Sequence, residues 1–316
     1  MNNSEILFLY DAKLTNPNGD IDDENRPRMD YERSINLVSD VRLKRYLRDY
    51  FINKELEVYA GQVDGKTVNA TKRLENLFEK YDEKINLTKL PEPAKQWMLD
   101  QLIDVRLFGA TMPIKSEGSK GGSLTYTGPV QFNWGHSLNK VSLVESSSIT
   151  SHFSSSDANE RGSIGKDYRL YYSLIAFHGL ISAKRAEHTR LADQDVQLLD
   201  EAIVRSIPLQ ATRSKVGQYP RLYLRVEYNN PEFISGDLRD YLRLEEQEGL
   251  RSVAETKVNI DLLVDKLVQV SDQIEKIHIW HDPALELEHK EETKPLTELL
   301  PPTLQEKVNS LEGAKV

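Results

Sequence analysis

The chain has 316 residues, a formal net charge of −9 at pH 7 and no cysteine. This length can bury a substantial core in one large or two smaller domains, and the lack of cysteine excludes disulfides and thiolate metal sites. Because no apolar run reaches about 18 residues and no signal-peptide core opens the chain, we expect a soluble cytoplasmic protein without membrane contact.

The negative charge is distributed unevenly along the sequence. Residues 221–316 carry 12 Lys and Arg against 20 Asp and Glu, a net charge of 12 − 20 = −8. Because the whole chain has a net charge of −9, residues 1–220 have a net charge of −1. Residues 203–226 contain five basic residues and no acidic one. Binding of a polyanion depends on the local field at a groove and not on the total charge. The composition therefore permits RNA binding.

The first predicted element is a buried strand at residues 6–10 (ILFLY), a short apolar run that contains aromatic residues. The strand is followed by residues 15–20 (TNPNGD), which have dense turn-forming chemistry. The chain then passes through an acidic patch and residues 26–28 (RPR) to a predicted helix at about residues 39–53.

The helix predicted at residues 39–53 is both amphipathic and basic. At about 100° per residue, its apolar side chains share an arc of roughly 140°; they are Leu43, Tyr46, Leu47, Tyr50 and Phe51. Lys44, Arg45 and Arg48 occupy an adjoining arc of about 100°, and Arg42 lies apart from both. A helix anchored by one face and basic on the next is suited to holding the backbone of a polyanion, but many surface helices are basic for solubility alone.

Three further elements follow a long interruption. The sequence predicts a strand at residues 168–177, a helix at residues 193–206 with termination at Pro208, and a half-exposed strand at residues 219–226. The order strand, helix, interruption, strand, helix, strand indicates an α+β fold built on a ferredoxin-like, or RRM-like, βαββαβ unit. An insertion at about residues 55–165 splits this unit.

The insertion and the C-terminal part have their own patterns. The insertion contains a predicted helix at residues 93–108, a Gly/Ser/Thr-rich passage at residues 118–128 and a polar stretch at residues 145–166. Long irregular segments of this kind are usually functional loops or disordered ones. Beyond residue 231 we expect an acidic extension, with a helix near residues 258–271 and a strand at residues 274–280.

The sequence contains no recognised catalytic or metal-binding motif. His278 and His281 would lie on opposite faces of a strand. Asn18, Asp20 and Asp22 match the start of a calcium loop, but the required glycine and the final glutamate are missing. A GxSxG elbow, an HExxH helix and a Walker loop are absent. We therefore expect no metal and no cofactor.

Scattered residues could still assemble a catalytic site. His152 and His188, together with neighbouring lysines and serines, are the material for a metal-independent ribonuclease. Their spacing does not favour this role over that of polar loop residues.

Several short blocks occur in a fixed order over most of residues 4–230. They are residues 16–20 (NPNGD), 24–28 (ENRPR), 38–50 (VSDVRLKRYLRDY), 104–110 (DVRLFGA), 127–132 (TGPVQF), 165–166 (GK), 177–179 (FHG) and 212–221 (TRSKVGQYPR). Each block alone is weak, but their order and spacing closely resemble one family. It is the backbone subunit of type I CRISPR Cascade surveillance complexes, a RAMP-type RNA-binding protein, and the blocks are most like subtype I-B. The acidic end after residue 231 carries less of the resemblance.

The resemblance implies an architecture of palm, fingers and thumb. The expected segments are a palm at 1–54 and 167–230, fingers at 55–144, a thumb loop at 145–166, and an acidic C-terminal extension packing on the palm at 231–316. The implied function is a non-catalytic scaffold, whose copies stack head to tail along a CRISPR RNA into a helical filament. The subunits hold the guide backbone independently of sequence and displace bases at regular intervals. The other bases pair with target DNA.

The resemblance also implies site residues. Contacts to the guide RNA are expected from basic and polar side chains: Lys44, Arg45, Arg48, Arg106, Lys166, Arg213, Ser214 and Lys215. Arg106 could instead buttress the palm. The candidates for the base-displacing thumb tip are Ile149, Thr150, His152 and Phe153, of which Phe153 could wedge between bases. Lys115 and Lys120, in the finger loop, are candidates for contacts to the guide, the target or a neighbouring subunit.

The implied partners are the guide, target DNA, further copies of the chain and other Cascade subunits. Because Lys44 and Arg48 lie off the apolar arc, replacing both is expected to weaken guide binding without unfolding the protein.

Two other functions remain open. One alternative is a RAMP-type metal-independent endoribonuclease that processes CRISPR precursor RNA and cleaves repeat RNA in EDTA. The other is a structural protein that assembles without RNA and does not respond to salt.

Overall fold

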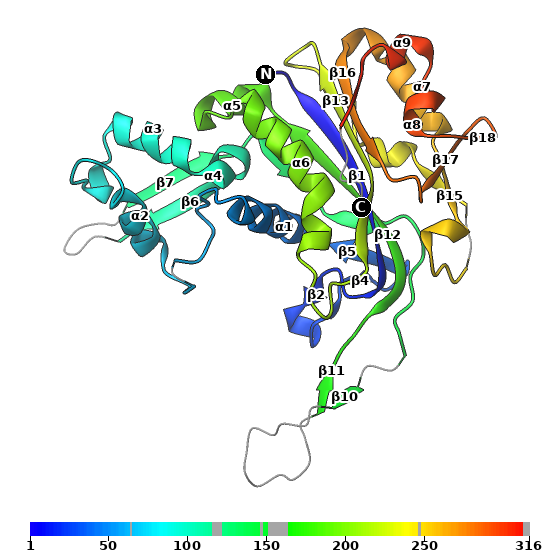
Figure 1. Cartoon of the computed structure of the whole chain (residues 1–316), viewed down its shortest axis with the longest axis horizontal. Helices are drawn as coiled ribbons and strands as arrows, with labels where there is room; N and C mark the ends of the chain where they lie inside the picture. The colour runs from blue at the N-terminus through cyan, green and yellow to red at the C-terminus, as the bar shows by residue number, and fades with distance from the viewer. Residues whose placement is uncertain (64, 116–121, 146–147, 151–163, 246–247, 312–316) are drawn as a thin grey trace.

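The structure is a computed structural model that describes residues 1–63, 65–115, 122–145, 148–150, 164–245 and 248–311. Within these residues a nine-stranded sheet forms the centre of the molecule (Figure 1). The strands are β1 (Ser4–Thr15), β4 (Met29–Asp30), β5 (Ile35–Val38), β8 (Val130–Phe132), β9 (Gly135–Ser137), β12 (Leu170–Ile181), β13 (Gln218–Tyr228), β16 (Ile274–His281) and β19 (Val308–Ser310). Their order is β19-β16-β13-β1-β12-β9-β5-β4, and β8 also pairs with β12.

The central strand β1 is buried on both faces. Ile6 and Phe8 belong to one hydrophobic cluster, whereas Leu7 and Leu9 belong to another on the opposite face. A strand covered on both sides reads as a continuous apolar run, which is the pattern seen at residues 6–10. The strand prediction is confirmed there, and β1 continues beyond the run at both ends. β1 pairs antiparallel with β12 and β13.

Two long helices cover one face of the sheet (Figure 1). They are α1 (Asp40–Asn53) and α6 (Asp193–Leu209). Every apolar residue predicted for the buried arc of the basic helix is buried in this cluster, which confirms the amphipathic assignment. The second helix ends at Leu209, one residue past the predicted termination at Pro208, and Ile207 before the proline remains buried. Pro208 removes a single backbone N–H from the last turn.

The C-terminal part covers the opposite face (Figure 1). Leu263 and Leu267 of α7 (Asp261–Gln269) share a cluster with Leu7 and Leu9. The remaining elements here are α8 (Leu296–Leu299), α9 (Pro302–Gln305) and a four-stranded sheet of β14 (Arg243–Leu244), β15 (Lys257–Asn259), β17 (Glu286–His289) and β18 (Glu292–Thr293). The predicted helix near residues 258–271 and the strand at 274–280 are thus confirmed, with slightly different bounds.

The insertion has a hydrophobic cluster of its own, which includes Leu77, Met98 and Met112. Its elements are α2 (Ala70–Phe78), α3 (Glu92–Gln101), α4 (Ile103–Phe108), and the hairpin of β6 (Gly109–Ile114) and β7 (Gly122–Thr127). The single helix predicted at residues 93–108 is wrong. Leu102 is buried in an extended conformation, with φ −101° and ψ 90°, and it separates α3 from α4.

Smaller elements complete the chain. They are β2 (Gly19–Asp20), β3 (Arg26–Pro27), α5 (Ala183–Thr189) and five 3-10 turns at Ile21–Asp23, Leu87–Lys89, Leu238–Tyr241, Val253–Glu255 and Ser271–Gln273. The strands β10 (Ser148–Thr150) and β11 (Ile164–Lys166) pair antiparallel and project away from the body of the molecule (Figure 1). Among the helices in the described residues, none combines the length and apolar composition that crossing a membrane requires.

Candidate nucleic-acid interface

The asparagine-rich motif after β1 builds a compact loop that fixes the start of α1. The Asn18 Oδ1 accepts hydrogen bonds from the Ser39 backbone N–H at 2.9 Å and from its hydroxyl at 2.8 Å. Asn16 Nδ2 donates to the Asn25 carbonyl at 2.8 Å. A Cβ on Gly19 would lie 1.9 Å from Asn25 Oδ1, so a larger residue there would displace the Asn25 side chain. The loop places the first turn of α1 beside the N-terminal motif.

Lys44 and Arg48 share one face of α1 and lie against the insertion. Their cationic groups are 5.7 Å and 5.4 Å from the ring centroid of Phe108, which confirms the i,i+4 placement. Lys44 Nζ is 3.0 Å from Asp40 Oδ2, and Arg48 Nε donates to Asp104 Oδ2 at 2.8 Å. The two basic side chains are only 10% and 17% exposed. The insertion covers this face and supplies the buried Asp104, so both side chains have structural contacts that the helical projection does not reveal. That both can be replaced without unfolding the protein stays a prediction.

Arg106 connects the insertion to α6. Its guanidinium binds Asp195 through two hydrogen bonds, of 2.9 Å from Nε and 2.8 Å from Nη2. Nη1 donates to the carbonyls of Leu99 and Asp100 at 2.8 Å and 2.6 Å. Four donated bonds leave this side chain little capacity for RNA. The geometry favours the buttressing role over RNA contact. Arg45, in contrast, is half-exposed on α1 and pairs with a residue of its own helix.

The loop after α6 packs against the end of β1. Gly217 accepts a hydrogen bond from the Lys13 backbone N–H at 2.8 Å, and the Ser214 carbonyl accepts one from the Asn16 N–H at 3.0 Å. Gly217 has a φ of +97°, and a Cβ there would lie 2.5 Å from the Lys13 carbonyl oxygen. Lys215 Nζ donates to the carbonyls of Asn16 and Pro17, the latter at 3.2 Å. Two distant sequence blocks therefore form one surface.

Further basic residues extend this surface toward β10 and β11. The Arg213 guanidinium is 3.2 Å from Asp167 Oδ2 and the side chain is 64% exposed. Lys166 Nζ lies 2.7 Å from Glu24 Oε2. Hydrogen bonds from Lys166 and Tyr168 lower the pKa of Glu24, so this carboxylate stays charged. We call the resulting surface the basic rim; it consists of Arg26, Arg42, Lys166, Arg169, Arg213 and Lys215.

Arg26, Arg42 and Arg169 are members of the basic rim that were not among the predicted contacts. Arg42 was left out because it lies apart from the other basic residues on the helical projection. In the structure its guanidinium carbon lies 4.1 Å from the ring centroid of Tyr46. Arg42 and Tyr46 are four residues apart on one helix, and this i,i+4 spacing is the sequence pattern that predicts such stacking.

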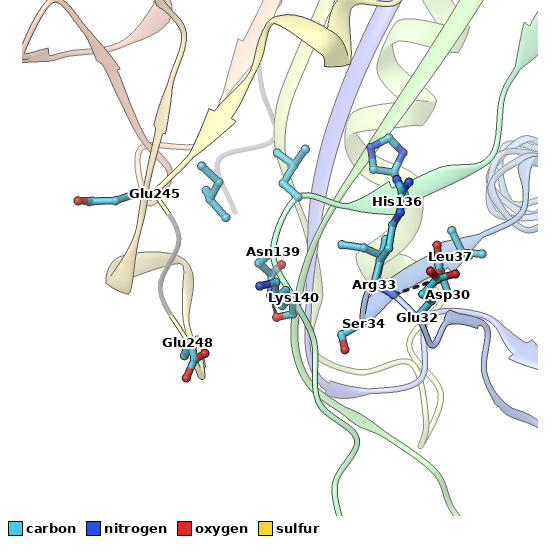
Figure 2. Close-up of a pocket in the computed structure, with 13 residues that line it drawn as sticks. Asp30, Glu32, Arg33, Ser34, Leu37, His136, Asn139, Lys140, Glu245 and Glu248 are labelled. Carbon is cyan, nitrogen blue, oxygen red and sulfur yellow. Dashed lines mark hydrogen bonds between the residues drawn. The ribbon is translucent and has the colours of Figure 1, made fainter.

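A recess of about 880 Å³ lies on another part of the surface, lined by residues of β4, β5 and β9 and by Leu244, Glu245 and Glu248 (Figure 2). Its charged lining residues are Asp30, Glu32, Glu245 and Glu248 against Arg33 and Lys140. Burial lowers the pKa of His136, which also lines the recess, so this ring adds no positive charge at neutral pH. Carboxylates outnumber cations in this recess and repel phosphate. It is not part of the candidate RNA interface.

The remaining predicted residues are only partly described. Ile149 and Thr150 lie in β10, opposite Gly165 and Ile164 of β11. His152, Phe153 and Lys120 lie outside the described residues. Lys115 is exposed directly after β6, and His188 is exposed in α5. In the described part of the chain, no group of three or more potential ligands is arranged to hold a metal ion.

Comparison with known proteins decides the family. The family model for CRISPR-associated protein Cas7 matches residues 2–261. The chain belongs to the CRISPR-associated protein Cas7 family. A Cas7 protein of Haloferax volcanii is 37% identical to it over 309 residues, which cover 93% of this chain and 91% of that protein.

Two solved structures are also similar to this Cas7 chain. One is a chain of a "CRISPR RNA-guided surveillance complex, pre-nicking", with 14% identity and a TM-score of 0.49 over 91% of this chain and 96% of the other. The second is a chain of a "CRISPR RNA-guided surveillance complex", with 14% identity and a TM-score of 0.46 over 91% and 94% of the two chains. The matched Cas7 family agrees with the resemblance carried by the sequence blocks.

Proposed function

We propose that this Cas7 chain is a non-catalytic scaffold for CRISPR RNA. Copies of the chain polymerise head to tail along the guide and form the helical backbone of a type I Cascade complex, most like subtype I-B. Target DNA and the other Cascade subunits are its further partners. The observation that carries this proposal is the Cas7 match over residues 2–261, a span that includes the basic rim and the helices that support it.

The palm of this proposal is a split ferredoxin-like unit. Its chain order would be β1, α1, β8 with β9, β12, α6 and β13, so residues 130–137 would belong to the palm and not to the fingers expected at 55–144. Two features support this assignment: these strands are neighbours in the order β13-β1-β12-β9, and both helices pack on the same face. The insertion with its own core would form the fingers, residues 145–166 the thumb, and residues 231–316 an extension packed on the palm.

A guide whose sequence differs between complexes must be held by its sugar-phosphate backbone. The basic rim suits this task because positively charged side chains attract phosphates whatever the base sequence. Arg45, Lys166, Arg213 and Ser214 are proposed to contact phosphates directly, and the ion pairs of the three exposed cations can exchange for phosphate. Lys44 and Arg48 would add positive potential while holding α1 against the insertion. The thumb candidates would displace bases at regular intervals.

The test is co-expression with and without a CRISPR array. After purification in moderate salt, the ratio of absorbance at 260 and 280 nm and the size distribution are measured. The proposal expects a high ratio and array-dependent, stepwise growth in size. A protein-like ratio and a monomer in both preparations, even with the other Cascade subunits co-expressed, would overturn it. Cleavage of repeat RNA in EDTA by the purified chain would instead support the endoribonuclease alternative.

A further inference from the structure

The C-terminal part covers its face of the central sheet incompletely. Leu9 of β1 lies opposite Ala176 of β12, and both are fully buried in the cluster that the C-terminal part completes. In the same row across the sheet, Ala176 lies opposite His136 of β9, and His136 lies opposite Leu37 of β5. Directly opposed residues of antiparallel strands project from the same face. Because His136 and Leu37 are only half-buried, the cover ends beyond β12.

Apolar side chains continue on this uncovered end of the face. Ile35 is two residues from Leu37, and Leu138 is two residues from His136, so each pair shares a face. The cover stops at Leu244 in β14, which is the edge strand of the C-terminal sheet. Ile35, Leu37, Leu138 and Leu244 are all half-buried, and all line the recess of about 880 Å³. They are apolar surface that a partner can remove from water.

The rim of the recess carries unpaired carboxylates. Figure 2 shows Glu245 and Glu248 on one side and Asp30 and Glu32 on the other. Among the described residues, none of these four carboxylates forms an ion pair, and Asp30 Oδ1 accepts a backbone hydrogen bond from Arg33 at 3.1 Å. Two cations also line the recess, so its local net charge is 2 − 4 = −2. An occupant that brings positive charge is therefore attracted.

The lining selects the chemistry of the occupant. The carboxylates repel nucleic acid, and the described residues include no group of three or more ligands that could hold a metal ion. A polypeptide with leucine-type side chains for the floor and lysine or arginine for the rim satisfies both parts of the lining. On the opposite face, α1 and α6 cover the sheet, and an amphipathic helix is the corresponding cover here.

We propose that the recess is a docking site for a basic amphipathic helix of another protein. The apolar stripe of that helix packs on the four apolar side chains of the floor, and its cations meet the carboxylates of the rim. The inference does not rest on the proposed scaffold function. The recess and α1 lie on opposite faces of the sheet, so a helix in the recess and an RNA at α1 do not compete.

The experiment uses a fluorescein-labelled synthetic peptide of about 14 residues, with leucine at heptad positions a and d and lysine elsewhere. Its anisotropy is measured against the purified full-length chain at about 0.15 M ionic strength, where long-range attraction is screened. Saturable binding is expected. The double variant Glu32→Lys with Glu245→Lys should bind about tenfold more weakly, because repulsive charges replace attractive ones at the rim.

The matched control is Glu79→Lys with Glu83→Lys. Both glutamates are exposed in the insertion and do not line the recess, so this variant has the same net charge as the recess variant. It should bind the peptide as the wild type does. Two further peptides test the lining without altering the protein: one has serine in place of leucine, and the other has glutamate in place of lysine. Each should bind about tenfold more weakly or less.

Four results would overturn the proposal. They are no saturable binding to the wild-type chain, equal weakening in the recess variant and its control, equal affinity for all three peptides, and RNA binding that the recess variant alone weakens. Sedimentation provides a fifth criterion. Self-association of the wild-type chain that the recess variant abolishes and the control retains would make the recess an interface between copies, and not a site for another protein.

Discussion

Replacement of Arg48 by alanine is expected to lower the free energy of unfolding by about 3 kcal/mol. Arg48 Nε donates to Asp104 Oδ2 at 2.8 Å, and the Asp104 side chain is 2% exposed. Removing one partner leaves a buried carboxylate without its counter-charge, which costs roughly 3–5 kcal/mol. The lower value applies here because the backbone N–H groups of Tyr59 and Ala60 still donate to Asp104, at 2.7 and 3.1 Å.

Urea denaturation followed by tryptophan fluorescence measures this loss. With an m-value of about 3 kcal/mol/M, the midpoint should fall by about 1 M. Arg45→Ala is the matched control, since Arg45 is 50% exposed and its pair with Asp49 should contribute less than about 1 kcal/mol. Adding Asp104→Asn to Arg48→Ala should recover part of the stability by removing the buried charge. Equal midpoints for Arg48→Ala and Arg45→Ala would refute the reasoning.

Arg106→Lys should cost roughly 2–3 kcal/mol in urea, because lysine cannot reproduce the bidentate contact with Asp195; an unchanged midpoint would contradict the buttressing role. Gly109→Ala should cost roughly 2 kcal/mol or more, since φ is +73° and the new Cβ would meet the Tyr126 carbonyl at 2.2 Å; a stabilised variant would disprove this. Burial lowers the pKa of Lys215 to about 7 from an ordinary value near 10.4, so the unfolded chain binds more protons between these values and stability should rise with pH from about 7 to 10. Lys215→Met should flatten this stability profile, measured by urea midpoints, and a profile parallel to wild type would exclude a lowered pKa for Lys215.

The main elements of the central sheet were predictable because their patterns are long. The strands around residues 6–10 and 168–177 show nearly continuous apolar runs, the strand at 219–226 and the helix at 39–53 show a clear apolar period, and all are present. Strands β8 and β9 are only three residues long, too short for a period of two to stand out. The break at Leu102 was invisible because it depends on burial within the insertion, whereas the flanking sequence reads as one helix.

The ion pairs of the candidate site could not be predicted from the sequence either. The sequence displays the basic residues but not the carboxylates that they meet in space. Asp104 is 56 residues from Arg48, and Asp195 is 89 residues from Arg106, so no local pattern could reveal either pair. The loop of residues 212–217 was correctly singled out as basic, but its contact with α1 through Gln218 depends on the tertiary fold.

The central position of β1 has a consequence for synthesis of the protein. Ser4 pairs with Ile181 on one side and with Glu227 on the other, so the first strand made is among the last to find its neighbours. At 5–20 residues per second, the ribosome needs roughly 8–30 s to produce the chain between β1 and β12. During that interval an apolar segment with two open edges is exposed in the nascent chain. Such a segment can pair with the same segment of another chain, so translation rate and chaperone supply should influence the yield of folded subunit more than the stability of the finished sheet does.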